Sequence, residues 1–279
     1  MRHARRPKLG QHFLRDPRFS RQIEEAILLE PGELLVEIGP GQGEMTRRLF
    51  PLAHRLVAIE LDPDLAAALQ REFQGNPSVE ILRGDILQTS IPTLCSRYGV
   101  QRCFVFGNLP YYITSPILLH LFSARSAIRR MALLMQREVA ERVTADPGSR
   151  DYGSLSVLAQ LDSEPRTILT LPPGAFSPPP KVYSALVDFH MAPRFPQWDE
   201  QARQKFLRFV QKCFAQKRKN LLNNLGAAYP RSRISNALEA AAIAASSRAE
   251  QLSLQQLAIL FGLLSQTSPE AGSAKDVLR

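Results

Sequence analysis

Short apolar segments alternate with helix-forming segments through much of this 279-residue chain, and that alternation constrains the fold more than any other feature. The segments expected to form buried strands are 34–39, 56–60, 79–82, 103–107 and 131–135. Those expected to form helices are 44–50, 63–73, 115–122 and 136–144. Alternating strands and helices predict an α/β fold, in which helices cover both faces of a mostly parallel sheet. Residues 182–189 alternate in polarity, and we expect them to close the sheet as an antiparallel edge strand.

The pattern changes near residue 191. Residues 191–198 contain two prolines and predict a linker, and the segments that follow are helical to about residue 265. We therefore expect an α/β domain at 1–192, which begins with a basic N-terminal arm, and a small all-α domain at 199–265. The small and polar residues at 266–279 predict a flexible tail.

A glycine-rich turn, Gly39-Pro40-Gly41-Gln42-Gly43, follows the first expected strand and opens a helix. Glycines let a ligand approach the backbone, and a helix N-terminus presents free N–H groups. Glu60 ends the second strand, where a carboxylate can accept both ribose hydroxyls, and Asp85 follows the third, where one can accept an adenine amino group. These groups predict a cofactor that contains a nucleoside. Both S-adenosylmethionine and a dinucleotide satisfy the pattern, and Glu44 beside the turn favours the cationic sulfonium over a pyrophosphate.

The fourth expected strand runs into Asn108-Leu109-Pro110-Tyr111. Pro110 restricts Leu109 to extended conformations, so the direction of the Leu109 carbonyl is largely set. That carbonyl and the Asn108 side-chain oxygen can accept hydrogen bonds from one exocyclic NH2 group, and Tyr111 can stack on the ring that bears it. The corner is therefore suited to an aminated planar ring such as adenine. A strand-to-loop turn is the simpler interpretation of the same residues.

The net charge of the chain is +9, and its basic residues are concentrated in two segments. The first contains Arg2, Arg5, Arg6, Lys8, Arg15, Arg18 and Arg21. The second contains Arg203, Lys205, Arg208, Lys212, Lys217, Arg218 and Lys219. Two separate basic clusters favour an extended polyanion such as RNA over a small phosphate ligand.

Several classes of protein do not fit the sequence. Cys95, Cys103 and Cys213 are too few for a disulfide framework and lack CxxC spacing, which favours a reducing compartment and a cytoplasmic location. The five histidines lack zinc-ligand spacing, so no metal is expected. No apolar run reaches the length of a membrane span, and the basic N-terminus lacks the apolar segment of a secretory signal.

Several motifs, taken in order, resemble one family, the ribosomal RNA adenine N6-dimethyltransferases, and within it the bacterial small-subunit branch. The resemblance runs from about residue 8 to residue 265. The matching segments are Lys8-Leu9-Gly10-Gln11-His12-Phe13-Leu14, Glu37-Ile38-Gly39-Pro40-Gly41, Glu60-Leu61-Asp62, Gly84-Asp85, Asn108-Leu109-Pro110-Tyr111-Tyr112-Ile113, Phe176-Ser177-Pro178-Pro179-Pro180-Lys181-Val182 and Cys213-Phe214-Ala215-Gln216-Lys217-Arg218-Lys219-Asn220-Leu221.

The resemblance implies a Rossmann-like class I methyltransferase sheet and S-adenosylmethionine as cofactor. It also implies dimethylation of two adjacent adenosines in the 3′-terminal hairpin of small-subunit (16S) rRNA, within a pre-30S particle. The cofactor-binding residues that follow from it are His12, Leu14, Gly39, Gly41, Glu60, Asp85 and Asn108. The first of these is often Asn in the family.

For catalysis we expect the Asn108 side chain and the Leu109 carbonyl to orient the target amine. Tyr111 is expected to stack on the target base, with Phe176 on its opposite face. A helix over 201–220 is expected to pack one apolar side and to present RNA-binding residues on the other. The RNA-binding residues expected here are Lys205, Arg208, Lys212, Lys217, Arg218 and Lys219.

Three other functions fit parts of the sequence. A large-subunit rRNA adenine dimethyltransferase shares most of the motifs. A non-catalytic nucleic-acid-binding or assembly factor would share the fold, but the intact Asn108-Leu109-Pro110-Tyr111 corner speaks against it. A nicotinamide-dependent oxidoreductase is the most remote. We expect a monomer.

Overall fold

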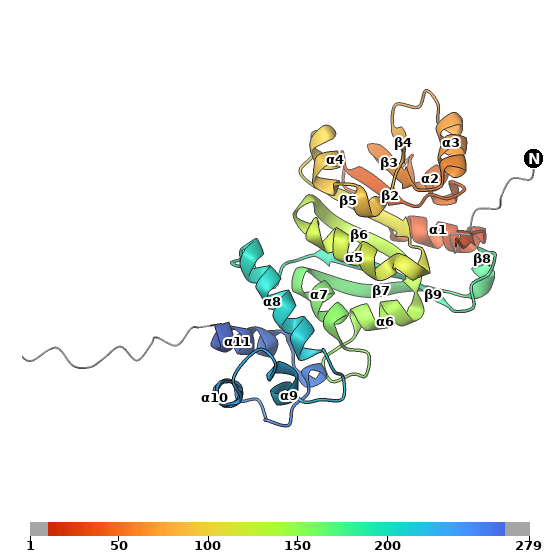
Figure 1. Ribbon diagram of the computed structural model, residues 1–279. Coiled ribbons are helices and arrows are strands. Elements are labelled where there is room, and N and C mark those ends of the chain that lie inside the picture. The colour runs from red at the N-terminus through yellow and green to blue at the C-terminus, as the bar shows by residue number, and fades with distance from the viewer. Residues whose placement is uncertain (1–10, 266–279) are drawn as a thin grey trace, which may run out of the picture. The chain divides into compact units, whose positions relative to one another are not determined.

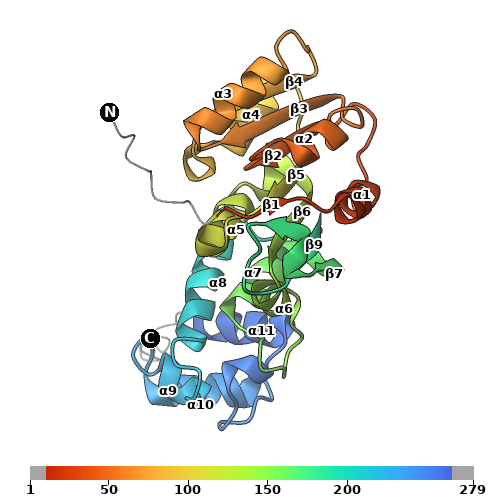
Figure 2. The same ribbon diagram turned by 90° about the vertical axis from the view of Figure 1, so that its right-hand side faces the viewer.

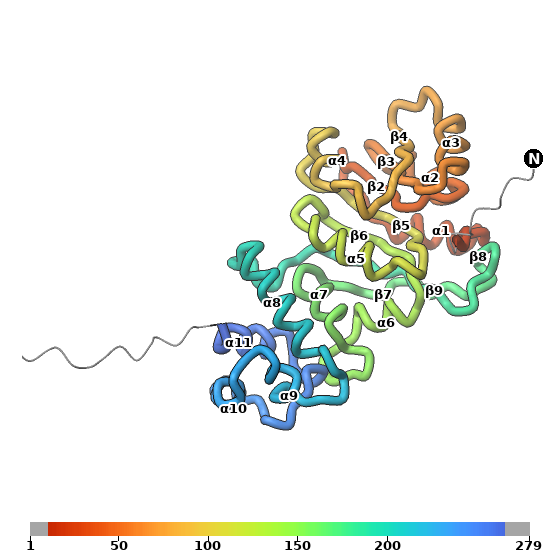
Figure 3. The backbone as a smooth tube through the Cα atoms, viewed as in Figure 1, coloured from red at the N-terminus to blue at the C-terminus, as the bar shows by residue number. Residues whose placement is uncertain are grey.

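The structure is a computed structural model that describes residues 11–265, so the expected tail at 266–279 and the basic residues before residue 11 lie outside it. The chain forms two compact units (Figure 1). The first contains the described residues up to Thr144 together with Leu158–Arg194. The second contains Ala145–Val157 and the residues from Phe195 onward. The trace in Figure 3 follows the chain into the second unit for Ala145–Val157, back to the first, and out again after Arg194.

A seven-stranded sheet of order β4-β3-β2-β5-β6-β9-β7 forms the framework of the first unit. Its strands are β2 (Leu34–Ile38), β3 (Arg55–Glu60), β4 (Val79–Arg83), β5 (Cys103–Asn108), β6 (Ile128–Gln136), β7 (Ser163–Leu171) and β9 (Ser184–Met191). The pairs from β4 to β6 are parallel, which confirms the predicted mostly parallel sheet. A separate antiparallel pair joins β1 (Phe13–Leu14) to β8 (Phe176–Ser177).

β9, the antiparallel strand that was expected at the edge of the sheet, is instead the second strand from that edge. β9 pairs antiparallel with both β6 and β7, so β7, which the sequence did not predict, forms the edge. β7 contains Pro165 and has a register irregularity between Thr167 and Leu169. Proline and irregular pairing are tolerated at a sheet edge, and they hide the strand pattern from the sequence.

Helices lie on both faces of the sheet, as Figures 1 and 2 show. Those that begin in the first unit are α1 (Pro17–Ala26), α2 (Glu44–Leu49), α3 (Pro63–Glu72), α4 (Ile91–Arg97), α5 (Thr114–Ser123) and α6 (Arg137–Thr144). One hydrophobic cluster joins residues of α1, α2 and α3 to alternate residues of the strands, including Leu35, Phe104 and Leu134. Because successive strand residues point to opposite faces, this cluster is the core of one face of the sheet.

Four strands bring polar groups to the same end of the sheet, the end at which their carboxyl termini lie. The chain order reverses between β2 and β5: β3 and β4 extend the sheet on one side, and β5 and β6 on the other. Sheets of this kind bind ligands outside the carboxyl ends of their strands at such a reversal. Glu37, Gly39, Glu60, Asp85 and Asn108 all lie at or just beyond the carboxyl ends of these strands.

The second unit is helical, with an aromatic core. Its helices are α8 (Glu200–Cys213), α9 (Leu221–Leu225), α10 (Arg231–Ala240) and α11 (Leu254–Ser265), and α7 (Ser154–Asp162) spans the boundary between the units. Both units also contain short 3-10 turns. Those of the first unit are Ile86–Gln88, Tyr111–Ile113, Arg125–Ala127 and Pro173–Ala175, and the second unit contains Ala249–Gln251. Phe261 of α11 packs against Phe206 and Phe209 of α8, with ring centroids 5.5 and 5.6 Å apart.

Two details of the predicted domain boundary differ from the structure. The expected linker does not stay free along its length, because the Trp198 ring stacks on Phe195 and packs edge-on against Phe206. Residues 145–157, expected in the first domain, group with the second unit, where the Gly148 N–H donates to the Glu250 carbonyl at 2.7 Å. Gly148 and Glu250 are 102 positions apart in sequence, so local patterns do not reveal their contact.

Candidate active site

A cavity of about 330 Å³ lies at the carboxyl ends of β2, β3, β4 and β5, within the first unit. Its volume is in the range typical of small-molecule sites. It gathers nearly all residues that the sequence singled out for cofactor binding and catalysis. Those that line it are His12, Leu14, Gly39, Gly41, Glu60, Asp85, Asn108, Leu109 and Tyr111.

Glu60, the last residue of β3, lies in the wall of the cavity and is only 2% exposed. One carboxylate oxygen accepts from the Gly41 N–H and the other from the Asp62 N–H, both at 2.9 Å. Burial raises the pKa of Glu60, and these backbone hydrogen bonds oppose the increase. Each oxygen keeps a second lone pair, so the fixed carboxylate can still accept hydroxyl groups from a ligand.

The glycine turn forms a close-fitting wall of the cavity. Gly39 and Gly41 have φ values of +63° and +58°, which favour glycine. A Cβ atom on Gly41 would lie 2.9 Å from the ring of Phe13, so β1 covers this part of the turn. Arg15, just beyond β1, donates to the side-chain oxygen of Gln42 at 2.9 Å and holds the same two segments together.

Replacing Gly41 by alanine is expected to weaken cofactor binding about tenfold or more, because the added methyl group must displace the Phe13 ring and the backbone is strained at φ +58°. Isothermal titration with S-adenosylmethionine measures the change. Gly75→Ala is the matched control: its φ is +82°, yet nothing lies within 4 Å of the added Cβ. Equal binding losses in the two variants would show that global strain, not the shape of the turn, is responsible.

Asp85 lies at the end of the loop that follows β4 and lines the cavity. Its Oδ1 accepts from the Leu87 N–H at 2.9 Å and caps the 3-10 turn Ile86–Gln88. This bond orients the carboxylate and leaves lone pairs on Oδ2 for a ligand.

The structure defines how Asn108 uses its amide. The side-chain NH2 group donates to the backbone carbonyl of His12 at 2.9 Å. That bond identifies Oδ1 as the atom left to accept from a ligand. The Leu109 N–H donates to the Leu134 carbonyl at 2.9 Å, which fixes the backbone of the corner between β5 and β6. The predicted pair of acceptors, Asn108 Oδ1 and the Leu109 carbonyl, is thus built on bonds to a strand and to the N-terminal segment.

Tyr111 is held at the corner by two contacts. Its hydroxyl and that of Ser184 lie 2.5 Å apart, and the His12 ring packs against the tyrosine ring with a centroid distance of 5.3 Å. Burial raises the pKa of Tyr111, and the bond to Ser184 opposes the increase. The His12 ring also bonds to the Pro178 carbonyl through Nδ1 at 2.7 Å. The contacts of the His12 ring and carbonyl therefore position Asn108 and Tyr111, a role that the sequence did not predict.

Phe176 does not line the cavity. Its side chain is 4% exposed and belongs to the hydrophobic cluster, where Phe176 pairs with Leu14 between β8 and β1. To stack on the target base, the Phe176 ring would first have to leave the core. A stacking role for Phe176 stays a prediction, and its observed role is packing.

Glu37 is a second cavity residue whose role the sequence did not predict. It is 2% exposed on β2, and its Oε2 atom has no hydrogen-bond partner among residues 11–265. Burial raises the pKa of Glu37 to about 7; the nearby Thr46 hydroxyl opposes the increase and the negative charge of Glu60 adds to it. A lone acid inside an apolar strand was the available signal, since an acid is rarely buried without a partner.

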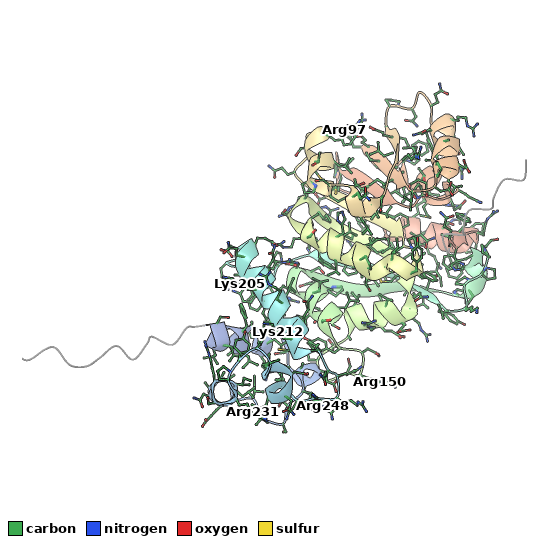
Figure 4. The ribbon with its side chains drawn as sticks, viewed as in Figure 1. Arg97, Arg150, Lys205, Lys212, Arg231 and Arg248 are labelled. Carbon is green, nitrogen blue, oxygen red and sulfur yellow. The ribbon has the colours of Figure 1, made fainter. Side chains whose placement is uncertain are left out.

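The expected RNA-binding residues lie in the second unit and are exposed, but not on one helix. Lys205, Arg208 and Lys212 follow one face of α8, and Figure 4 labels the first and last of them. The helix was expected to reach residue 220 but ends at Cys213, so Lys217, Arg218 and Lys219 lie in the following loop. Lys217 Nζ donates to the Arg150 carbonyl at 2.7 Å.

The apolar side of α8 is as expected, with Phe206, Phe209, Val210 and Cys213 buried. Arg203, which the sequence placed in the basic cluster, is also buried at 6% exposure and pairs with Glu200 at 3.7 Å.

Among residues 11–265, no group of three or more metal-ligating side chains comes together. In the same part of the chain, no helix combines the length and apolarity needed to span a membrane.

Comparison with known proteins agrees with this geometry. The family model described as Ribosomal RNA adenine dimethylase matches residues 2–266. The protein named Ribosomal RNA small subunit methyltransferase A of Acidobacterium capsulatum is 47% identical over 264 residues, covering 94% of this chain and 92% of that protein. The protein of the same name from Koribacter versatilis is 40% identical over 273 residues, covering 94% and 95%.

Two solved structures share the fold. The 23S rRNA methyltransferase ErmE matches with a TM-score of 0.71 and 29% identity, covering 91% of this chain and 100% of that one. A dimethyladenosine transferase from Plasmodium falciparum matches with a TM-score of 0.74 and 24% identity, covering 89% and 96%. Because the family model spans nearly the whole chain and relatives at 40–47% identity match over 92–95% of their own length, this protein belongs to the ribosomal RNA adenine dimethylase family.

Proposed function

We propose that this protein dimethylates N6 of two adjacent adenosines in the 3′-terminal hairpin of small-subunit rRNA during ribosome assembly. The observation that carries the proposal is the corner of β5, where the bond from Asn108 to the His12 carbonyl leaves Oδ1 as an acceptor beside a nucleoside-sized cavity. Family membership supports the adenine, and the names of the relatives at 40–47% identity support the small subunit.

The cofactor is S-adenosylmethionine, and the described residues fit it. Glu60 and Asp85 are the acceptors for its ribose and adenine, and the glycine turn is too closely packed for a side chain at Gly41. Glu37 adds an unpartnered carboxylate oxygen to the same cavity, which a hydrogen-bond donor on the cofactor would satisfy. When bound, the cofactor supplies a methyl group activated by its attachment to a sulfonium.

The protein's own contribution is to orient a weak nucleophile. The lone pair of an adenine amine is delocalised into the ring, so the nitrogen reacts poorly until that overlap is reduced. Asn108 Oδ1 and the Leu109 carbonyl can accept the two N–H groups and favour the positive charge that develops on nitrogen. Tyr111, held by Ser184, supplies a fixed ring against which the base can lie. The adenine must leave its RNA stack to enter, which is easiest from an unpaired loop.

The structural similarity to ErmE supports a second candidate, dimethylation of large-subunit rRNA. One experiment separates the two. Undermethylated small and large subunits are incubated separately with labelled S-adenosylmethionine, and the modified nucleosides are mapped. We expect N6-dimethyladenosine in the small subunit. Label in the large subunit alone would favour the second candidate, and the absence of N6-dimethyladenosine from both would reject the enzymatic proposal.

The RNA is proposed to contact the exposed basic residues of the second unit as well. Replacing Arg218 and Lys219 by glutamine is expected to weaken RNA binding and to reduce the slope of log K against log salt by about 1.4 to 1.8, because fewer counterions are released. Filter binding at several salt concentrations measures the slope. Lys217 is left in place because it holds the Arg150 carbonyl and its loss could disturb the loop.

A matched pair on the first unit serves as the control. Arg71 and Arg83 are exposed there, so Arg71→Gln with Arg83→Gln removes the same charge from a different surface. If the two double variants reduce the salt slope equally, net charge and not the loop after α8 determines binding.

We further propose that the protein acts as a cytoplasmic monomer on a pre-30S particle. Cys95, Cys103 and Cys213 are all free and buried, which suits a reducing compartment.

A further inference from the structure

An exposed tyrosine and an arginine form a fixed pair close to the proposed target site. Tyr183 is 48% exposed, although large aromatic side chains are usually well buried. The guanidinium carbon of Arg137 lies 5.4 Å from the centroid of its ring. The backbone N–H of Arg137 also donates to the Tyr183 carbonyl at 2.9 Å, and the Arg137 side chain forms an ion pair with Glu141 at 3.2 Å. Backbone and side-chain contacts therefore both hold the pair in place.

The sheet topology places Tyr183 and Arg137 at the end of the sheet where the cavity lies, beside the carboxyl end of β6. β9 runs antiparallel to β6, so its first residue, Ser184, lies opposite Gln136 at the carboxyl end of β6. Ser184 is also the residue whose hydroxyl contacts Tyr111. Tyr183 is its immediate neighbour, and consecutive Cα atoms are about 3.8 Å apart. Tyr183 is thus one residue along the chain from Ser184, the partner of the tyrosine proposed to hold the target base.

The two tyrosines differ in their surroundings. Tyr111 is partly buried and lines the cavity, whereas Tyr183 lies outside the cavity, next to the exposed Lys181 and Val182. Nucleobases stack on the rings of aromatic side chains and on the planar guanidinium of arginine, and this pair presents both groups side by side. Its exposure and its two planar groups suit a base that does not enter the cavity.

We propose that Tyr183 and Arg137 form a second stacking site, which binds the nucleobase adjacent to the target adenine in an unpaired RNA strand. The proposal rests on the proposed function and deepens it. When the target base leaves the stack, the neighbouring base loses a stacking partner, and the Tyr183–Arg137 pair replaces it. The site thereby lowers the cost of extruding the target and holds the strand beside the cavity.

The test uses the full-length protein and a synthetic RNA hairpin that contains the target adenosine. Single-turnover methyl transfer is compared for the natural sequence and for RNAs with an abasic residue immediately 5′ or 3′ of the target. Tyr183→Leu is expected to reduce transfer to intact RNA about tenfold, while Tyr183→Phe, which keeps the ring, stays within about twofold of the unsubstituted protein. The affinity of each variant for S-adenosylmethionine checks that the cavity is intact.

The abasic RNAs separate stacking from a purely structural role. One of them should slow the unsubstituted protein about tenfold but slow the Tyr183→Leu variant little further, because the two changes remove the same contact. Equal slowing of both proteins by both abasic RNAs would overturn the stacking site and leave the proposed function standing.

A binding measurement decides the question even if the isolated hairpin is not methylated. That outcome would leave the proposed function standing, because its proposed substrate is a pre-30S particle and its test uses whole subunits. RNA with 2-aminopurine next to the target should lose fluorescence on binding to the unsubstituted protein and to Tyr183→Phe, because stacking quenches the base. The Tyr183→Leu variant should bind with less quenching. The same quenching in all three proteins would overturn the stacking site.

Discussion

Replacing Asn108 by alanine is expected to reduce methyl transfer by at least about 100-fold while leaving RNA affinity within about twofold. The change removes Oδ1, the proposed acceptor for the target amine, and the NH2 group that holds the His12 carbonyl at 2.9 Å. Loss of one preorganised group that stabilises developing charge typically costs a factor of 10² to 10³. The residues of the second unit that are proposed to bind RNA are unchanged. Single-turnover transfer and filter binding measure the two quantities separately.

Asn76→Ala is the matched control for this prediction. Asn76 is also partly buried in the first unit and makes one local bond, accepting from the Ser78 N–H at 2.9 Å, but it lies outside the cavity. Its variant should keep nearly full transfer. If Asn108→Ala lost RNA binding and transfer to the same extent, Asn108 would be a structural residue and the catalytic assignment would be wrong.

Glu37 is expected to make the stability of the cofactor-free protein depend strongly on pH. Burial raises its pKa from 4.5 to about 7 in the folded protein, so the folded state binds a proton that the unfolded state has already released. Between these values unfolding releases a proton, and the free energy of unfolding falls as pH rises. At about 1.4 kcal/mol per pH unit, the loss reaches about 3 kcal/mol above pH 7 and vanishes below pH 4.5.

Urea unfolding of the Glu37→Gln variant isolates this effect. The variant cannot titrate at position 37, so its stability relative to the unsubstituted protein should rise by up to about 3 kcal/mol from pH 4.5 to pH 7.5. A constant offset from the substitution itself does not affect that difference. Glu25→Gln removes an exposed glutamate from α1 and is the matched control. Parallel pH profiles for Glu37→Gln and the unsubstituted protein would contradict a buried, neutral Glu37.

Much of the fold follows from local pattern. β2, β3 and β5 are largely apolar and buried along their length because both of their faces are covered, and the order of strands and helices along the chain predicts the parallel sheet. β7 escaped prediction because an edge strand needs only partial apolar character and tolerates Pro165. The end of α8 was also missed, because the basic residues after Cys213 are compatible with a helix and nothing local marks its termination.

Phe176 shows the limit of placing a residue by motif. The sequence puts it beside a proline run, where a stiff loop could present the ring to a base. In the structure, β8 pairs with β1, and the ring enters the core at 4% exposure. Whether a phenylalanine is buried or presented depends on which segment pairs with its own. Here that partner lies more than 150 residues away along the chain.

The sequence by itself determined the class of fold and the placement of Glu60, Asp85 and the Asn108-Leu109-Pro110-Tyr111 corner at the cavity, because each depends on a residue's position at the end of a strand. Only the tertiary structure decided which atoms of that corner are free. Residues 11–15 line the cavity, the His12 carbonyl accepts from the Asn108 NH2 group, and the His12 ring packs against Tyr111. A hydrogen bond between residues 96 positions apart leaves no periodic trace in a sequence, so the orientation of the Asn108 amide emerges only when the chain is folded.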